Sequence, residues 1–281
     1  MSRDFRFGML YAPRESRHTS MAASRAVFQA DAKRCEDLGY DVLSMPDHLG
    51  SLAPFPALAA AAQVTTMIRL GTCVLNAGFY RPALLARDAA EVDLLSDGRL
   101  ELGLGAGYVE AEFDAAGLPF PPGRERIEHL RHVVSHLKAH LPRVPVMVAG
   151  NGDRMLRFAA QSAQIVGLMG APTGGGVDDP LGDRMAVIRN AVGGRSVHLE
   201  LNLLVPAVPT DGTGQPDLAV PRRELPHLSD AELIQLPGVL AGSPRDVADT
   251  LREYRSRYGI TYFTIFQHHA EFFAKVIGEL R

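Results

Sequence analysis

The sequence predicts an α/β protein in which eight parallel strands close into a (β/α)8 TIM barrel. Short apolar runs alternate eight times with longer segments of helical periodicity, a pattern typical of parallel sheets. A length of 281 residues fits one domain of this architecture. The stretch MLYAPRES, at the end of the first predicted strand, lacks the glycine motif of an open dinucleotide-binding sheet. We therefore expect a single domain over residues 1–281.

The predicted strands are short apolar runs that pass into loops. The third, for example, ends at Asn76, Ala77 and Gly78, as a buried parallel strand does. The eight strands are expected at 6–11, 42–45, 69–75, 99–104, 144–149, 164–169, 197–205 and 262–266.

The predicted helices have recognisable faces and ends. In the first, Cys35 and Leu38 lie on one apolar face before Gly39 ends the helix. In the third, Pro82 suits the first turn and Gly98 supplies the stop. The helices are expected at 20–38, 54–67, 83–96, 123–141, 153–163, 180–193, 244–258 and 270–280.

One segment, residues 206–237, interrupts this alternation. It contains six prolines and shows little periodicity, and it follows the seventh predicted strand. Active sites of barrels are built from the loops after the carboxyl ends of the strands. We interpret 206–237 as a structureless insertion that forms a lid over that face; a mobile loop without such a role is equally consistent.

A glycine-rich turn follows the fourth predicted strand. Gly103, Gly105 and Gly107 leave the backbone bare where it turns over the edge of the sheet. A flat ring or a phosphate could approach closely there, although the glycines do not form the GxGxxG fingerprint and could simply allow a tight turn. Tyr108, directly after the turn, could donate or accept a proton near a bound ring.

Histidines lie at the same face of the predicted barrel. His48 follows the second strand, where an imidazole could exchange protons, and its alternative is a loop histidine bonded to backbone. Asp47 beside it could set the tautomer. His268 and His269 end the eighth strand, and the pleat decides which of them faces the site.

A second glycine turn joins the fifth strand to a helix. Ala149, Gly150, Asn151 and Gly152 run into the helix that begins near Asp153. Free amides at a helix start can hold a phosphate, whereas the alternative is a simple connecting turn.

Composition limits the possible functions. With 29 basic and 32 acidic residues and a net charge of −3, nucleic acid is not an expected partner. The charged N-terminus and the absence of about 18 uninterrupted apolar residues predict a cytoplasmic protein without a membrane partner. Cys35 and Cys73 form no CxxC pair, so neither a disulfide framework nor a cysteine metal site is expected.

Four histidines line one side of the predicted helix at 123–141. They are spaced by three or four residues, which could in principle chelate a metal. Since that helix belongs to the outer ring and lacks an HExxH motif, we expect a solvated stripe and no metal site. The four are His129, His132, His136 and His140.

Several blocks together resemble the bacterial luciferase-like family of TIM-barrel oxidoreductases, which use a flavin or the deazaflavin coenzyme F420. The most specific block is RLGTCVLN followed by RPALLARDAAEVDLLSDGRLELGLGAGY. The others are LGYDVLSMPDH, GLPFPPGRERIEHL, VPVMVAGNGDRMLRFAA and GSPRDVADTLREYRSRYGITYFTI.

The resemblance implies roles for individual residues. His48 is expected beside the deazaflavin ring, a non-proline cis peptide between Cys73 and Val74 behind the ring, and the turn at 150–152 around a phosphate. The expected catalytic residues are His48 and Tyr108. The expected coenzyme-binding residues are Asp47, Cys73, Val74, Asn76, Gly105, Ala106, Gly107, Ala149, Gly150, Asn151 and Gly152.

The chain also departs from one branch of that family. Its F420-dependent sugar-phosphate dehydrogenases have a tryptophan soon after the histidine and a glutamate in the glycine turn. This chain has no tryptophan, and Tyr108 takes the place of the glutamate. We therefore do not carry over that substrate.

Three functions follow from these observations. The first is an F420-dependent oxidoreductase that moves hydride between the deazaflavin C5 and a small-molecule substrate, with His48 or Tyr108 handling the companion proton. The second uses FMN, reduced by a partner flavin reductase, for monooxygenation. The third is a non-catalytic flavin-binding relative, against which the presence of His48 argues. The resemblance favours the first and implies a homodimer.

Overall fold

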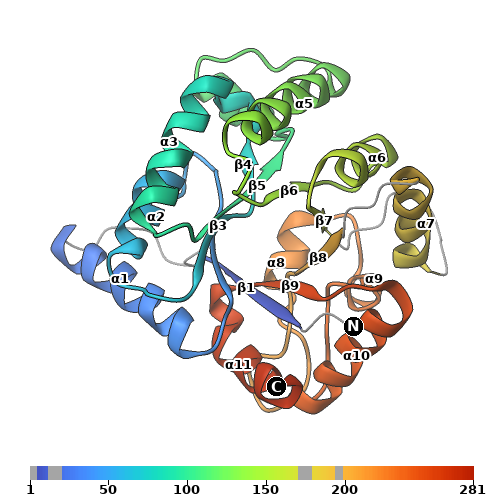
Figure 1. Cartoon of the computed structure of the whole chain (residues 1–281). Coiled ribbons are helices and arrows are strands. Elements are labelled where there is room, and N and C mark those ends of the chain that lie inside the picture. Colours follow the sequence, from blue (N-terminus) through green and yellow to red (C-terminus); the bar gives the residue numbers. More distant parts are fainter. Residues whose placement is uncertain (1–4, 12–20, 170–178, 194–198) are drawn as a thin grey trace.

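The strands form a closed parallel barrel surrounded by helices (Figure 1). This computed structural model describes residues 5–11, 21–169, 179–193 and 199–281. The sheet order is β3-β2-β1-β9-β8-β7-β6-β5-β4, and an additional β3–β5 pairing closes the barrel. The predicted (β/α)8 TIM barrel is confirmed.

The strand positions agree with the prediction, except that the third predicted strand is divided. A cis peptide bond joins Cys73 to Val74, as the family resemblance implies, and separates β3 from β4. The strands are β1 Arg6–Leu10, β2 Val42–Met45, β3 Arg69–Thr72, β4 Leu75–Asn76, β5 Leu100–Gly105, β6 Val146–Ala149, β7 Ile165–Leu168, β8 Glu200–Val205 and β9 Tyr262–Phe266.

Eight helices follow the strands as predicted and form the outer ring in Figure 1. Local sequence explains several of their starts: proline occupies the first turn of α2, α3, α7 and α10, and Ser243 and Asp246 form a capping box on α10. These helices are α1 Met21–Asp37, α2 Pro54–Ala62, α3 Pro82–Leu95, α5 Gly123–His140, α6 Asp153–Ser162, α7 Pro180–Val192, α10 Pro244–Tyr258 and α11 Ala270–Leu280.

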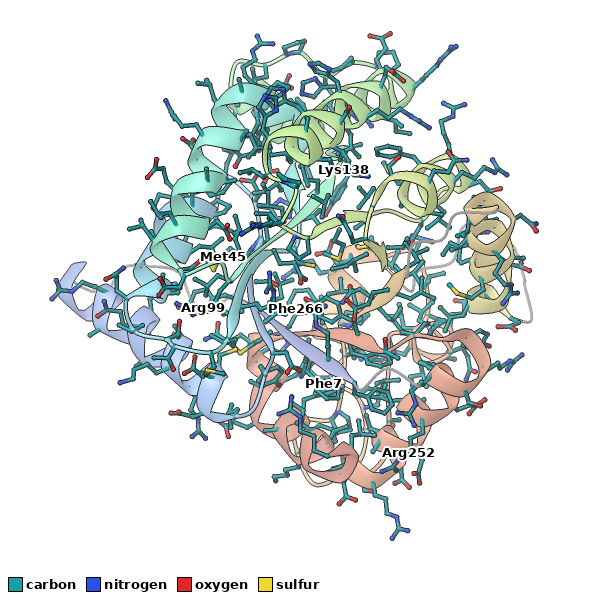
Figure 2. The ribbon with its side chains drawn as sticks, in the orientation of Figure 1. Phe7, Met45, Arg99, Lys138, Arg252 and Phe266 are labelled. Carbon is teal, nitrogen blue, oxygen red and sulfur yellow. The ribbon has the colours of Figure 1, made fainter. Side chains whose placement is uncertain are left out.

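The largest hydrophobic core lies between the barrel and this ring. Phe7 on β1 is fully buried, and its ring packs edge-on against Phe273 of α11, with centroids 5.8 Å apart. Figure 2 shows Phe7 toward the helices in the lower part of the view and Arg252 farther out. In the described part of the chain, no helix combines the length and apolar character needed to cross a membrane.

The prediction that residues 206–237 are structureless is wrong. The segment contains two short helices, α8 Ala219–Glu224 and α9 Asp230–Ile234. Ser229 caps α9 in a capping box with Glu232, and a small hydrophobic cluster, centred on Leu218 and Leu233, packs beneath both helices. Prolines stood out in the sequence, but local caps and this cluster give the segment its own structure. Its role as a lid stays a prediction.

The barrel closes through a side chain as well as backbone. At the end of β3, the Thr72 hydroxyl donates to the Gly103 carbonyl oxygen (2.8 Å) and accepts from the Gly103 N–H (2.9 Å). Both groups are buried. A Cβ atom on residue 103 would lie only 2.1 Å from the Thr72 carbonyl oxygen and 2.7 Å from Met147 Cε, so this closure requires glycine.

We predict that Gly103→Ala lowers the free energy of unfolding by about 3 kcal/mol, because the added methyl must displace backbone. Gly278→Ala is the matched control: it lies in α11 with nothing within 4 Å of an added Cβ, and should raise stability by roughly 0.5–1 kcal/mol. Urea unfolding of both variants checks this. Equal effects of the two substitutions would contradict the role of Gly103.

Candidate active site

Asp47 and His48, at the carboxyl end of β2, point to different partners. The Asp47 carboxylate accepts the Asn76 N–H (2.9 Å) and a hydrogen bond from the Tyr80 hydroxyl. Burial raises the pKa of Asp47 above its ordinary value, although these two donors and His48 act in the opposite direction. Asp47 therefore fastens the loop after β2 to the loop after β4.

A glutamate from a different loop contacts His48. Both carboxylate oxygens of Glu112 lie close to His48 Nδ1, at 3.0 and 3.1 Å. Our suggestion that Asp47 sets the His48 tautomer is therefore wrong, because the Asp47 carboxylate is turned toward Asn76 and Tyr80. Glu112 belongs to α4 (Glu110–Ala115), a short helix after β5 that the sequence did not predict.

Tyr108 lies beside the histidine. Its ring meets the His48 ring edge to face, with centroids 6.3 Å apart, and 67% of the residue is exposed. Partial burial of the phenol is the main cause that raises the Tyr108 pKa, and the Glu224 and Glu112 carboxylates raise it further. The hydroxyl therefore keeps its proton at neutral pH. Since Glu224 belongs to α8, the 206–237 segment comes near this site.

Two closely packed glycines, at the end of β5 and in the turn after it, lie next to these side chains. Gly107 has φ +76°, and a Cβ there would lie 2.2 Å from the Asn76 Oδ1 atom. At Gly105 a Cβ would lie 2.9 Å from Val74 Cγ2. The Asn76 and Val74 side chains thus lie directly against these two glycines. Ala106, between the glycines, packs against the main hydrophobic core.

Cys73 and Val74 face the barrel interior. They pack against a small cluster of buried residues that includes Met147 and Tyr262. Cys73 is a free thiol, and burial raises its pKa to about 12, with a further contribution from Glu101. The thiol is therefore neutral at physiological pH, so this part of the site is apolar.

The turn after β6 has one conformational requirement. Ala149 ends the strand, and Gly150 adopts φ +157°, where a Cβ would lie 2.6 Å from Met155 Cγ. The Gly150 N–H donates to the Gly167 carbonyl oxygen (3.2 Å), and the Asn151 side chain accepts the Met169 N–H (3.1 Å). These two groups hold the turn in place.

The N-terminus of α6 therefore supplies the amides suited to an anion. Gly152 is the N-cap residue and makes no side-chain cap, so the first amides of the helix have no partner from that side chain. Arg184 of α7 donates to the Asn151 carbonyl oxygen (2.9 Å) and pairs with Asp153 (3.2 Å). Sequence reasoning did not identify this arginine.

The prediction that the four histidines of α5 form a solvated stripe is wrong for the first of them, His129. His129 Nε2 lies 3.0 Å from the Ala77 carbonyl oxygen and 3.2 Å from that of Tyr80, so it donates to the loop after β4. His132 and His140 are exposed. Among the described residues, no group of three or more His, Cys, Asp or Glu side chains could hold a metal ion.

The two histidines after β9 differ in environment. His269 is buried, and its Nε2 donates to the Pro206 carbonyl oxygen (3.2 Å), where the 206–237 segment begins. His268 is half-buried, with its ring 5.8 Å from that of Phe266. His269 thus anchors the insertion.

Comparison with known proteins identifies the family. The luciferase-like monooxygenase family matches residues 5–176, which is more than half of the chain. The chain belongs to this family.

Two curated relatives are F420-dependent glucose-6-phosphate dehydrogenases. The one from Kribbella flavida is 35% identical over 116 residues, covering 38% of this chain and 35% of that enzyme. The one from Intrasporangium calvum is 31% identical over 164 residues, covering 46% of this chain and 49% of that enzyme. The matched part of the chain therefore spans between about a third and a half of these relatives.

Solved structures share the fold over nearly the whole chain. The coenzyme F420-dependent tetrahydromethanopterin reductase from Methanopyrus kandleri has a TM-score of 0.74, with 16% identity, over 99% of this chain and 100% of that one. An F420-dependent secondary alcohol dehydrogenase in complex with an F420-acetone adduct has a TM-score of 0.76, with 16% identity and the same coverage. At this identity the likeness shows the fold alone.

The environment of Asp47 predicts a pH dependence of stability. Burial raises its pKa above the ordinary 3.8, so the folded chain binds more protons here than the unfolded chain as the pH rises past 3.8. Relative to Asp47→Asn, which does not titrate, the wild type should lose stability across this window until the raised pKa is passed. Urea unfolding of both proteins at several pH values measures the free energy of unfolding of the wild type minus that of Asp47→Asn. A value that rises with pH would contradict the prediction.

Proposed function

We propose that this protein is an F420-dependent oxidoreductase that transfers hydride between the coenzyme and a small organic substrate. The observation that carries the proposal is the contact between the His48 and Tyr108 rings beside the closely packed glycines Gly105 and Gly107. The F420-dependent relatives support the choice of coenzyme. When bound, F420 supplies a two-electron hydride carrier that does not usefully activate oxygen.

The residues present fit a flat ring with an anionic tail. Cys73 and Val74 would form an apolar support on the barrel side, with Asn76, Gly105 and Gly107 beside the ring. A Cβ at residue 107 would collide with the Asn76 side chain, so Gly107 allows Asn76 to pack against the turn. At the other side, the first amides of α6 after Gly152 would hold a phosphate, with Arg184 nearby to offset the negative charge of Asp153.

His48 would handle the proton that accompanies the hydride. Its Nδ1 is engaged with Glu112, so Nε2 is the atom available to give or take a proton. Tyr108 keeps its hydroxyl proton and would donate a hydrogen bond to the substrate. The substrate itself would lie between these two side chains and the 206–237 segment, whose Glu224 comes near Tyr108.

The homodimer, the cytoplasmic location and the lid role of residues 206–237 stay predictions. The departures at Tyr108 and in tryptophan content distinguish this chain from sugar-phosphate dehydrogenases, so the substrate is left at the level of a small organic molecule.

Titration with each coenzyme tests the proposal. We expect purified protein to bind F420 and not FMN, measured by the change in fluorescence of each coenzyme on binding. Binding of FMN alone, with activity that requires a flavin reductase and oxygen, would instead support an FMN-dependent monooxygenase. Tight binding without turnover of any screened substrate would point to a non-catalytic relative.

We predict that His48→Ala slows turnover by about 10²- to 10⁴-fold, the usual contribution of a general acid or base, and leaves F420 affinity nearly unchanged. His140→Ala is the control, because this exposed histidine lies on the outer helix α5. Steady-state kinetics with F420 and a coenzyme titration measure both quantities. If His48→Ala turned over at the wild-type rate, His48 would be a loop histidine without a catalytic role.

A further inference from the structure

We propose that Glu112 is a positioning residue that holds the proton of His48 on Nδ1 and so reserves Nε2 for exchange with the substrate. For the reaction that it would serve, this inference rests on the proposed function. The arrangement of the two side chains does not depend on any coenzyme and can be measured without one.

The geometry of the pair defines which nitrogen carries the proton. Nδ1 lies 3.0 Å from one Glu112 oxygen and 3.1 Å from the other, so a single N–H donates to both. A carboxylate only accepts, which places a hydrogen on Nδ1 in the neutral ring as well as in the charged one. The unprotonated nitrogen of the neutral ring is therefore Nε2.

The two side chains of this pair differ in exposure. The Glu112 side chain is 19% exposed, whereas that of His48 is 43% exposed. The carboxylate is thus largely shielded from water and salt, while the ring keeps one side open to the site. The neighbouring Asp47 does not compete, since its carboxylate is bonded to Asn76 and Tyr80.

The fold fixes the carboxylate by burying the residue that follows it. Phe113 is 2% exposed and packs between Phe79 and Phe120, with ring centroids 5.3 and 5.1 Å away. Gly78 leaves the room for this ring, since a Cβ there would lie 2.5 Å from Phe113 Cε1. Phe113 therefore anchors α4 and sets the direction of Glu112.

A second contact ties this anchor to the glycine turn. Arg126 stacks on the Phe120 ring, 4.0 Å from its centroid, and its Nε donates to the Gly107 carbonyl oxygen (3.1 Å). The aromatic cluster, the turn at Gly107 and the His48–Glu112 pair are thus parts of one packed unit. The tautomer of His48 is set by the same contacts that shape the coenzyme surface.

The proton and electron balance of the reaction is simple. When bound, F420 would supply the acceptor for a hydride, with its two electrons, from the substrate carbon. In the oxidation direction the substrate O–H or N–H would give its proton to His48 Nε2. Glu112 keeps the Nδ1 proton in place throughout and offsets the positive charge of the ring. The proton on Nε2 then passes to water, and reduction of the substrate runs through the same steps in reverse.

Nuclear magnetic resonance of the full chain without coenzyme tests the inference. The ¹⁵N shifts of the His48 ring, assigned by comparison with His48→Gln, report which nitrogen carries the proton in the neutral form. We expect Nδ1–H in the wild type, in Glu112→Gln, which keeps an acceptor oxygen, and in Asp114→Asn, which removes a charge from an exposed position on the same helix. In Glu112→Ala we expect the proton to move to Nε2.

Kinetics with F420 supply the second readout. Glu112→Ala should lower kcat at least about 10-fold with an unchanged KM for the coenzyme, while Asp114→Asn should match the wild type. A wild-type ring with its proton on Nε2, or an Nδ1 proton that persists in Glu112→Ala, overturns the inference. The expected tautomers in a protein that does not use F420 would support the role of Glu112 and refute the proposed function instead.

Discussion

The mutual hydrogen bonds between Thr72 and Gly103 are the interaction on which the barrel and its site depend. The pairing of β3 with β5 joins the two ends of the sheet order, and its backbone ladder extends over only two residue pairs. The Thr72 hydroxyl continues the pairing from a side chain, at 2.8 and 2.9 Å. Directly beyond it come Cys73 and Val74, followed by β4, which pairs with β5 again. The same contact therefore closes the barrel and positions Cys73 and Val74, the apolar residues that follow it.

From this closure, a small number of contacts organise the carboxyl face. Asp47 joins the loop after β2 to that after β4, and His129 of α5 supports the same loop from outside. Arg126 holds the turn after β5, and Glu112 returns from that turn to His48. Each contact joins segments far apart in the chain. Together they explain how His48, which follows β2, lies beside Tyr108, which follows β5.

Local sequence was sufficient to predict the alternation of strands and helices, because apolar period, prolines in the first turns and glycines after the helices are short-range signals. It was also sufficient to locate His48 and the glycine turn at the right end of their strands. The cis bond at Cys73 came from family resemblance, since no periodicity encodes it. Residues 206–237 were misread because prolines dominate the composition, whereas the capping box at Ser229 and the buried Leu218 and Leu233 determine the structure.

The partners of the candidate site residues were the least accessible to sequence reasoning. Glu112 lies 64 positions from His48, on a helix of six residues that is too short for a clear period. His129 lies about 50 positions from the carbonyl groups to which it donates, within a stripe whose other exposed members suggested solvent. The contact of Glu112 depends on the packing of Phe113, and that of His129 depends on the packing of α5 against the loop after β4. Both kinds of packing exist only in the folded barrel.

In the proposed function, the surface formed by Cys73, Val74, Gly105 and Gly107 receives the coenzyme ring. A crystal structure of the protein grown with oxidised F420 tests it most directly. The account predicts the deazaflavin ring against these four residues, with His48 at its side and a phosphate at the first turn of α6. A ring bound elsewhere on the molecule, or a phosphate held away from Gly152, would contradict the account.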